Sequence, residues 1–303
     1  MAIQPTTVEE LTKIVDQYQI RYIDLQFTDV VGVVKNITIP VHELHTAVEN
    51  GIWFDGSSIE AYARVAESDM HLCHDISSFA IIPWLNGEEA TARMICDVYT
   101  PDGQPFAGDP RAILRRVEKS AEEMGFKYNT GPEMEFFLFK PHADGSLLPL
   151  QPHDSASYFD APSDKAAGLR RHMASTLASF GIQTETMHHE IAGGQHELDL
   201  RYADVLSTAD NVITFRMALK VIAQLNGLYA TFLPKPIKGM AGSGMHVHQS
   251  LTYAVTGKNA FYDPGDSYGL STTAKQFIAG QLAHARGMCA ILAPLVNSYK
   301  RLY

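Results

Sequence analysis

Residues 131–139 read GPEMEFFLF, and this stretch decides the fold of the larger part of the chain. A short run of aliphatic and aromatic residues with a period of two predicts a β-strand. Because side chains alternate across a strand, Glu133 and Glu135 share one face, while Met134 and Phe136 share the other. We expect the aromatic residues to belong to a core, namely Phe136, Phe137 and Phe139.

Two further segments carry polar residues with the same period. Residues 184–200 are predicted to form a hairpin turned by Ala192–Gly194. Within it, residues 187–200 read MHHEIAGGQHELDL, with Glu190 before the Gly-Gly turn and Glu197 after it. Residues 242–251 read GSGMHVHQSL, in which two histidines and Ser250 alternate with apolar residues. A polar row is ordinarily a solvated sheet face, but carboxylates within apolar strands are costly unless they are paired or bind a metal. Several carboxylates with few imidazoles suit Mg²⁺ or Mn²⁺ rather than zinc, and such sites commonly bind phosphates.

The pattern along the rest of the chain predicts an α+β fold in two domains. The first domain, residues 1–106, begins with a capped helix, whose signature is Thr7 followed by Glu10. A Pro- and Gly-rich segment, residues 101–110, is expected to join it to a second domain of residues 107–303. The first domain is further expected to contain a hairpin (21–40), a helix (41–50), a loop (52–70) and strands (78–83, 90–99). The second is expected to contain helices at 110–124, 165–180, 202–227 and 272–293 and a strand at 230–233.

Composition and charge exclude several classes of protein. Of the 303 residues, 46% are hydrophobic and 19% are charged, which is typical of a globular protein. The net charge of −10 disfavours non-specific nucleic-acid binding, because that binding depends on Lys and Arg that neutralise phosphates. No nucleic-acid partner is therefore expected.

The three cysteines and the N-terminal residues bear on the cellular compartment of the protein. Cys73, Cys96 and Cys289 form no CxxC pair, which disfavours a disulfide framework or a zinc–thiolate site and suggests a reducing environment. The N-terminal residues show no signal-peptide pattern, and no run of about 18 apolar residues predicts a membrane span. We expect a cytoplasmic protein without a membrane partner.

Five segments together resemble the signature segments of class I glutamine synthetases, in the same order and approximate spacing. They are FDGSS (54–58), GPEMEFFLF (131–139), HHEIAGGQHE (188–197), LPKPIKGMAGSGMHVHQSL (233–251) and NSYKRL (297–302). The resemblance covers the whole chain. It implies a β-grasp-like N-terminal domain, followed by a catalytic domain with a curved antiparallel sheet. It also implies stacked hexameric rings, a dodecamer, with active sites between adjacent subunits.

The resemblance implies a ligase that uses ATP to join ammonia to L-glutamate, giving L-glutamine, ADP and phosphate through γ-glutamyl phosphate. It further implies two or three Mg²⁺ or Mn²⁺ ions per site. By motif position, one ion would be bound by Glu135, Glu190 and Glu197, and a second by Glu133 and His246. The residues that match ATP contacts are Glu185, His248 and Ser250.

The substrate residues also follow from motif position. Gly242 and Arg301 match glutamate-binding positions, and the planar fork of Arg301 suits the α-carboxylate of the substrate. Asp55 matches the aspartate that binds ammonium and takes its proton, and in the family this residue comes from the small domain of a neighbouring subunit. Asp69 matches a second acid near that position. His188 is expected either to orient a neighbour or to touch substrate.

Two departures from the family pattern leave alternatives open. Ala241 stands where many members carry an Asn that helps to bind the substrate amino acid, so a γ-glutamyl ligase for polyamines or other amines is an alternative. The intact FDGSS and ESD segments favour ammonia. The family is normally about half as long again, so we expect the chain to be truncated after Tyr303, without the flap glutamate, several arginines and the last metal ligand. An inactive metal-binding fragment is the second alternative.

Overall fold

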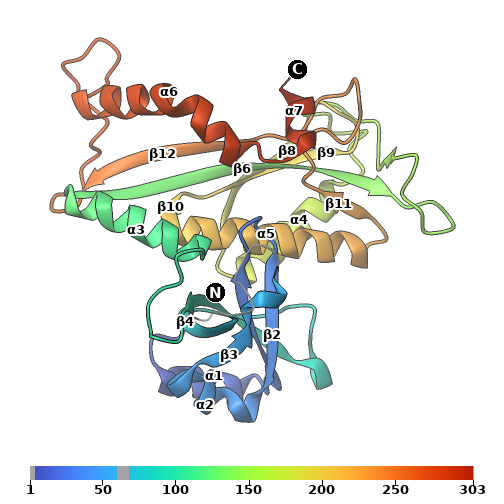
Figure 1. Ribbon diagram of the computed structural model, residues 1–303. Coiled ribbons are helices and arrows are strands. Elements are labelled where there is room, and N and C mark those ends of the chain that lie inside the picture. Colours follow the sequence, from blue (N-terminus) through green and yellow to red (C-terminus); the bar gives the residue numbers. More distant parts are fainter. Residues whose placement is uncertain (1–3, 60–67, 303) are drawn as a thin grey trace. The chain divides into compact units, whose positions relative to one another are not determined.

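The computed structural model describes residues 4–59 and 68–302 (Figure 1). The chain forms two compact units, one of Met1–Val117 with Ser175–Ile182, the other of Glu118–Ala174 with Gln183–Tyr303. Helices and strands are mixed in both units, which confirms the predicted α+β class. The domain boundary predicted near residue 106 stays a prediction. Among the described helices, none is long and apolar enough to span a membrane.

The first unit is built on a five-stranded sheet with the order β2-β1-β5-β4-β3. Strands β1 and β5 are parallel, and the other neighbours are antiparallel. The strands are β1 (Tyr22–Thr28), β2 (Val34–Pro40), β3 (Ile52–Asp55), β4 (Asp69–Ile81) and β5 (Thr91–Tyr99). The helices are α1 (Val8–Gln17) and α2 (Leu44–Asn50), with short 3-10 turns η1 (Val41–Glu43), η2 (Gly56–Ser58) and η4 (Gly87–Glu89). Apolar side chains of these elements form one core, which includes Leu11, Ile23, Leu25, Leu72, Met94 and Val98.

The prediction of a loop over residues 52–70 is wrong where the structure describes this stretch. Residues 52–55 form β3, and β4 begins at Asp69, well before the strand predicted at residues 78–83; residues 60–67 lie outside the described part. Met70 and Leu72 are buried and alternate with more exposed neighbours, which is the period of a strand. A register irregularity between Asp75 and Ala80 interrupts this period, so only a few residues of the strand show it before the interruption.

The predicted cap of the first helix is confirmed. The hydroxyl of Thr7 accepts a hydrogen bond from the backbone N–H of Glu10 at 3.2 Å, and the carboxylate of Glu10 accepts one from the backbone of Thr6 at 2.8 Å. These bonds satisfy donors that a helix start would otherwise leave without a partner.

Replacing Thr7 with alanine is expected to lower the free energy of unfolding by about 1 kcal/mol, because the Glu10 N–H loses its acceptor. Thr12→Ala is the matched control, since Thr12 is exposed inside the same helix, where alanine is the better helix former. Urea unfolding followed by far-ultraviolet circular dichroism measures both variants. Equal stability of the two variants would contradict the assigned cap.

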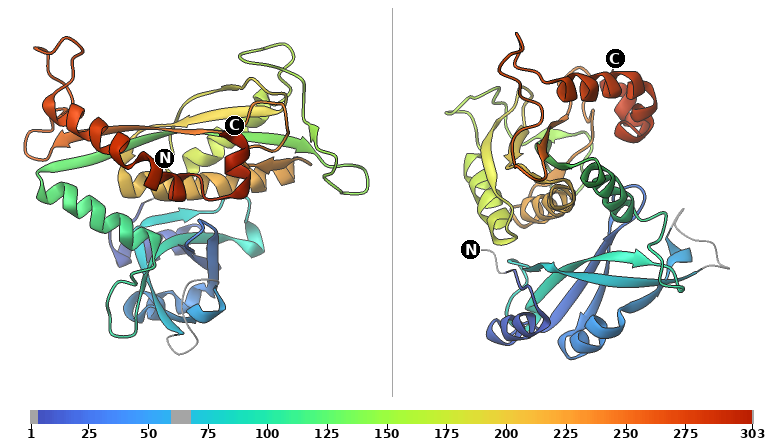
Figure 2. Two further views of the ribbon diagram at one scale, coloured as in Figure 1. Left: turned by 45° about the horizontal axis from the view of Figure 1, so that its top comes forward. Right: turned by 90° about the vertical axis from the view of Figure 1, so that its left-hand side faces the viewer.

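The second unit is built around β6 (Phe126–Lys140), the central strand of a seven-stranded sheet. Its antiparallel neighbours are β7 (Gln151–Pro152), β9 (Gln195–Leu200), β10 (Ala203–Asp204), β11 (Tyr229–Thr231) and β12 (Met245–Tyr253), and β8 (Thr184–His189) pairs with β9. Its helices are α5 (Val205–Leu225), α6 (Thr272–Leu292) and α7 (Val296–Arg301), whereas α3 (Pro110–Glu123) and α4 (Ala167–Ser179) are each divided between the two units. Helix α5 lies along the sheet and packs on β6 and β11 (Figure 2).

The predicted aromatic core is confirmed. Phe136, Phe137 and Phe139 are fully buried, and the rings of Phe137 and Phe139 stack with centroids 5.7 Å apart. Phe136 instead contacts the ring of Phe215 on α5. These contacts hold the end of β6 that follows Glu133 and Glu135 rigidly against its neighbours, so the two carboxylates project from a fixed strand.

Candidate active site

The register of the large sheet brings the predicted metal ligands into two adjacent rows. Glu135 of β6 is the cross-strand partner of Glu197 of β9, and Glu197 is the partner of His188 of β8. One row further, Glu133 lies between His246 of β12 and Asp199 of β9. Cross-strand partners have Cβ atoms about 5 Å apart, so side chains from four strands converge.

Carboxylates repel one another in the first row. Burial raises the pKa of Glu197 to about 8, with further contributions from the negative charges of Asp199, Glu135 and Glu190. Glu190 joins this group from the start of the β8–β9 turn, directly after His189. The imidazole of His188 lies between two of the carboxylates, with Nε2 3.2 Å from Glu197 Oε1 and Nδ1 3.8 Å from Glu190 Oε1. A cation among these oxygens would relieve the repulsion.

The second row is centred on Glu133, which contacts two imidazoles. Its Oε2 lies 2.8 Å from His246 Nδ1, and its Oε1 lies 2.5 Å from His248 Nε2. Hydrogen bonds from His248 and His246 hold the pKa of Glu133 below its ordinary value although burial opposes this. The structure thus brings Glu133 and His246 together, as the metal assignment requires, and it adds His248 to the same carboxylate.

The glycine-rich segment closes around Glu135. Oε2 of Glu135 accepts hydrogen bonds from Gln195 Nε2 and from the backbone N–H of Gly244, both at 3.0 Å. A Cβ atom added at Gly244 would lie 2.6 Å from Arg301 Nη2 and 3.1 Å from Glu135 Oε1. Gln195 also donates to the carbonyl of Gly242 at 3.2 Å. Arg301, Gly242 and Glu135 are therefore neighbours, and a side chain at position 244 would displace the guanidinium of Arg301 from its present place.

Helix α7 holds Arg301 in this place. Asn297 at its start makes two hydrogen bonds with the backbone of Lys235, which donates to Asn297 Oδ1 at 2.7 Å and accepts from Nδ2 at 3.0 Å. The NSYKRL segment is thereby fixed to the P-K-P segment, and Arg301 lies in the last turn of α7. We did not predict this helix from the sequence, because six residues are too few to show a helical period.

The nucleotide residues lie on two separate strands. His248 and Ser250 are on β12, and Glu185 is exposed on β8. Strands β6 and β9 separate β8 from β12, so these three side chains lie across the width of the sheet rather than side by side. Their assignment to ATP stays a prediction.

Asp55 and Asp69 belong to the first unit and are cross-strand partners on β3 and β4. Asp55 Oδ1 accepts hydrogen bonds from the backbone N–H and the hydroxyl of Ser57 at 2.8 and 2.6 Å, which lowers the pKa of Asp55. Both aspartates are exposed. Like charges directly opposite one another are unfavourable in a sheet, so this pair favours a small cation.

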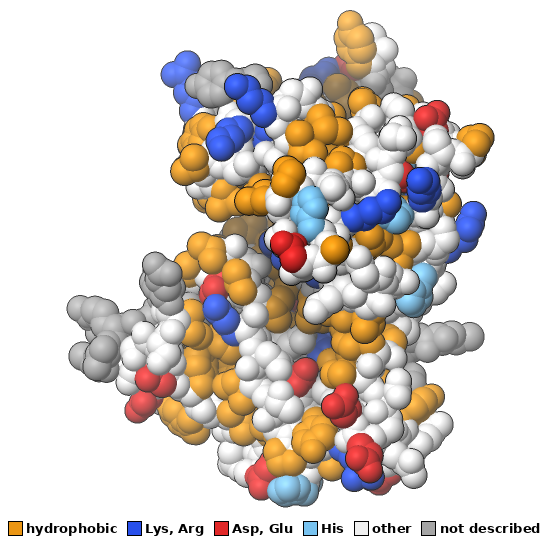
Figure 3. All heavy atoms as spheres, turned by 90° about the vertical axis from the view of Figure 1, so that its right-hand side faces the viewer, with side chains coloured by type: hydrophobic (Ala, Val, Ile, Leu, Met, Phe, Trp, Pro, Cys, Tyr) orange, Lys and Arg blue, Asp and Glu red, His pale blue; other side chains and the backbone are white. Residues whose placement is uncertain are grey.

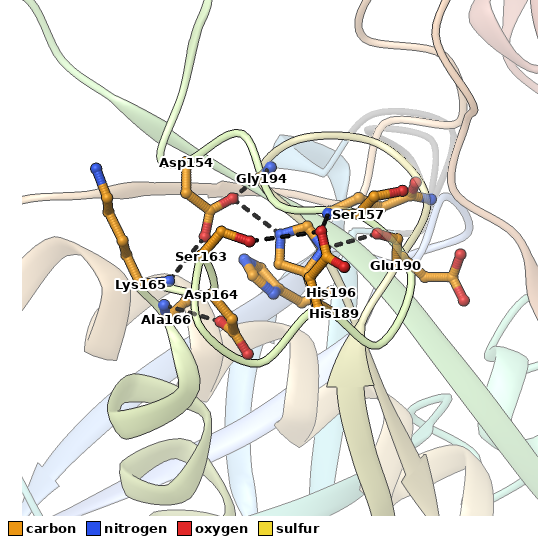
Figure 4. Close-up of polar contacts among 12 residues, drawn as sticks. Asp154, Ser157, Ser163, Asp164, Lys165, Ala166, His189, Glu190, Gly194 and His196 are labelled. Atoms are coloured by element: carbon orange, nitrogen blue, oxygen red, sulfur yellow. Dashed lines mark hydrogen bonds and ion pairs between the residues drawn. The ribbon is translucent and has the colours of Figure 1, made fainter.

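A second group of possible ligands, Asp154, His189 and His196, is fully buried behind the first row (Figure 4). It does not fit a metal ion, because Arg170 Nη1 lies 2.9 Å from His196 Nδ1 and brings its own positive charge. Burial and the charge of Arg170 lower the pKa of His196 to about 3, so this ring is neutral. We interpret the group as structural, since its side chains form hydrogen bonds with Arg170 and with the Gly-Gly turn.

The donor set of the two rows fits a hard divalent cation. Carboxylate oxygens predominate, imidazoles are few, and no cysteine takes part among the described residues. Ligand atoms of His188, Glu197 and Asp199 all lie within 4.8 Å of one another. Sequence reasoning left His188 undecided and did not single out Asp199 as part of this group, although its period-two position after Glu197 was the available signal.

Metal binding is expected to weaken below pH 8. The raised pKa of Glu197, about 8, means that the neutral acid predominates at neutral pH, whereas a cation requires the carboxylate. Affinity should therefore fall by up to about tenfold per pH unit as the pH decreases below 8, with release of a proton on binding. The same shift implies that the metal-free fold loses stability from this group as the pH rises through about 8.

Calorimetric titration of Mn²⁺ in two buffers of different ionisation enthalpy measures the released proton. Glu197→Gln is the control, since glutamine cannot release one. An affinity that does not change between pH 6 and 8 would contradict the role of Glu197.

Comparison with known proteins shows the family to which the chain belongs. The sequence model of the glutamine synthetase catalytic domain matches residues 107–303, and that of the glutamine synthetase β-grasp domain matches residues 19–101. The chain belongs to the glutamine synthetase family. The first unit is accordingly the β-grasp domain, which confirms the fold expected from the resemblance.

Relatives of known name agree with this membership. The chain is 49% identical over 297 residues to a glutamine synthetase of Clostridium saccharobutylicum and 48% identical over 299 residues to one of Staphylococcus aureus. Each match covers 98% of this chain and 66% of the relative, so the chain spans slightly less than two thirds of their length.

Solved structures of the glutamine synthetase fold are also similar. The structure titled "Apo GmaS without ligand" is 32% identical with a TM-score of 0.84, and the match covers 96% of this chain and 68% of that one. A glutamine synthetase of Plasmodium falciparum has a TM-score of 0.90 at 23% identity, covering 99% and 64% of the two chains, and therefore shows the fold alone.

Proposed function

We propose that the protein ligates ammonia to L-glutamate at the expense of ATP, giving L-glutamine, ADP and phosphate. The observation that carries the proposal is the convergence of three carboxylates, Glu135, Glu190 and Glu197, beside the guanidinium of Arg301. The first step of this reaction brings two anions together, the carboxylate of glutamate and the phosphate of ATP, and it needs this combination of cation-binding and anion-binding groups. Family membership and the named relatives support it.

Two or three Mg²⁺ or Mn²⁺ ions would neutralise the negative charges of ATP and of the substrate carboxylate when bound. Glu135, Glu190 and Glu197 would hold one ion, and Glu133 with His246 would hold another. Gln195 and Gly244 fix the carboxylate of Glu135 through its Oε2, so its free oxygen has a set direction. Asp199 and His188 adjoin these ligands and complete the polar surroundings.

The substrates are placed by the remaining residues. Arg301 binds the α-carboxylate of glutamate beside Gly242, which leaves the γ-carboxylate to attack the γ-phosphorus of ATP and form γ-glutamyl phosphate. Asp55 binds ammonium and takes one proton, and ammonia then attacks the acyl carbon and releases phosphate. Orientation and charge stabilisation supply most of the catalysis in such transfers.

Nucleotide and assembly complete the proposal. Glu185, His248 and Ser250 contact ATP, and the ADP complex described for GmaS, 32% identical to this chain, supports an adenine nucleotide. We further propose that Asp55 serves the site of a neighbouring subunit in a ring-shaped homo-oligomer, as the family resemblance implies.

The three free cysteines favour a cytoplasmic location. Figure 3 shows both acidic and basic side chains on one face of the molecule, and the net charge of −10 fits small-molecule substrates better than nucleic acid.

A ligase for another amine is the second candidate. Ala241 packs against the apolar cluster of Phe137, Phe139 and Ala192, so position 241 offers no polar group to the substrate. The similarity to GmaS adds weight to this second candidate, because a protein that is similar over 96% of this chain carries a name other than glutamine synthetase.

The test is phosphate release from ATP with L-glutamate and Mg²⁺, measured with ammonia, methylamine or spermidine as the acceptor. We expect the highest ratio of kcat to KM with ammonia. A higher ratio with an amine would support the second candidate. Metal binding without phosphate release for any acceptor would contradict the ligase and favour a metal-binding protein without activity.

A further inference from the structure

One buried carboxylate, that of Asp154, joins three segments behind the metal ligands (Figure 4). Its Oδ1 accepts hydrogen bonds from His189 Nε2 at 2.8 Å and from the backbone N–H of Gly194 at 3.0 Å. Its Oδ2 accepts one from the backbone N–H of Lys165 at 3.1 Å. The side chains of Asp154 and His189 are both fully inaccessible to solvent. The end of β8, the Gly-Gly turn and the segment before α4 are thus tied to one group.

His189, which is held by Asp154, in turn bonds to the backbone of Glu190. Its Nδ1 donates to the carbonyl of Glu190 at 2.6 Å, and the backbone N–H of Glu190 donates to the carbonyl of Gln195 at 2.8 Å. Both peptide groups that flank the Glu190 side chain are therefore held. Each ring nitrogen of His189 thus faces an oxygen atom, that of Asp154 on one side and that of the Glu190 carbonyl on the other.

The backbone packed around the Gly-Gly turn leaves no room for a Cβ atom at either glycine. A Cβ atom at Gly193 would lie 2.8 Å from the carbonyl oxygen of Asp154, and one at Gly194 would lie 2.7 Å from that of Leu138. Gly194 also has a φ of +69°, which favours glycine. The backbone after residue 152 and the turn before β9 are therefore packed directly on each other.

The segment that follows Asp154 also contacts His188, through Phe159. Phe159, at a φ of +60°, donates its backbone N–H to the carbonyl of His189 at 3.2 Å. Its ring meets that of His188 edge to face, with centroids 4.8 Å apart. A non-glycine residue with this φ is strained and persists only where surrounding contacts hold it. Asp154 anchors the segment at its start.

We propose that Asp154 is a positioning residue of the metal site formed by Glu135, Glu190 and Glu197. Its carboxylate orders His189 and the Gly-Gly turn, so that Glu190 stands in place before a cation arrives. The inference rests on the metal site of the proposed function. Outer partners of metal ligands typically contribute about 10- to 100-fold in metal affinity. Asparagine cannot replace Asp154, because three donors face its two oxygens and an amide NH₂ would meet one of them.

The test is calorimetric titration with Mn²⁺ alone on the whole chain, comparing wild type with Asp154→Asn. We expect the Kd of the site that contains Glu190 to rise about 10- to 100-fold, while the site of Glu133 keeps its affinity. Asp144→Asn is the matched control, since Asp144 is exposed and its Oδ1 accepts a hydrogen bond from the backbone N–H of Ser146 within its own turn. A merely structural role would lower the melting temperature without separating the two metal sites.

A second variant, His189→Asn, keeps a donor near the carbonyl of Glu190 but loses the bond to Asp154. We expect the same selective loss of Mn²⁺ affinity. Unchanged affinity in either variant with a wild-type circular dichroism spectrum would overturn the proposal, and so would loss of the fold in both, because the pair would then be a general stabilising element. The variant Glu190→Gln distinguishes a failure of the positioning role from a failure of the proposed metal site. If it loses Mn²⁺ while Asp154→Asn does not, the positioning role fails and the metal site stands; if wild type binds no Mn²⁺, the proposed function fails.

Discussion

Asp55→Ala is expected to lose ammonia-dependent turnover by about 100- to 10,000-fold, the range that general acid–base groups contribute. Binding of Mn²⁺ and of nucleotide should remain, because Asp55 and the carboxylate rows belong to different compact units. The physical reason is that ammonium must lose a proton before its nitrogen can attack, and the lowered pKa of Asp55 keeps its carboxylate charged to bind the cation. Initial rates of phosphate release against ammonia concentration measure the effect.

Asp55→Asn separates this role from a turn role. Asparagine still offers an oxygen to the backbone N–H of Ser57, which now bonds to Asp55 at 2.8 Å, but carries no charge. We expect it to be as inactive as the alanine variant. Asp102→Ala, which changes another exposed turn aspartate of the same unit, should keep full turnover. Recovery of turnover in Asp55→Asn would show that Asp55 only shapes the turn.

Glu135→Ala is expected to abolish measurable Mn²⁺ binding at one site, a loss of roughly 100-fold or more, since it removes a ligand itself rather than an outer partner. The remaining carboxylates, Glu190 and Glu197, cannot replace the water that a hard cation gives up. The alanine variant also leaves Gln195 Nε2 and the Gly244 N–H without their shared acceptor. Calorimetry with Mn²⁺ measures the loss.

Two controls accompany Glu135→Ala. Glu135→Gln keeps an acceptor for Gln195 and Gly244 and removes only the charge, so it should fold as wild type and still lose the ion. Glu122→Ala removes an exposed carboxylate on α3 and should bind Mn²⁺ normally. If Glu135→Gln binds as tightly as wild type, Glu135 is not a ligand.

The sequence predicts those parts of the fold whose signal is local. The alternation in GPEMEFFLF gives the strand, the two faces of Glu133 and Met134, and the buried phenylalanines, because a period of two has one structural meaning. The hairpin of residues 184–200 follows from its Gly-Gly turn in the same way. The first half of β4 was missed because an irregularity after Asp75 breaks the period.

The site depends on register, which no local pattern contains. That Glu135 stands opposite Glu197, and that Asp55 stands opposite Asp69, follows from strand pairing between segments far apart in the chain. Asp154 carried no sequence signal, since HDSAS resembles an ordinary polar loop, and its importance lies in three backbone and side-chain donors from elsewhere. Sequence motifs predicted the metal ligands, whereas the residues that would support them became visible only in three dimensions.

Anomalous X-ray diffraction from crystals of the protein soaked in Mn²⁺ tests the central claim most directly, because it locates the cations. The account predicts one anomalous peak among the carboxylates of Glu135, Glu190 and Glu197 and another between Glu133 and His246. Peaks absent from both places, or found only at the buried group of Asp154, His189 and His196, would contradict it.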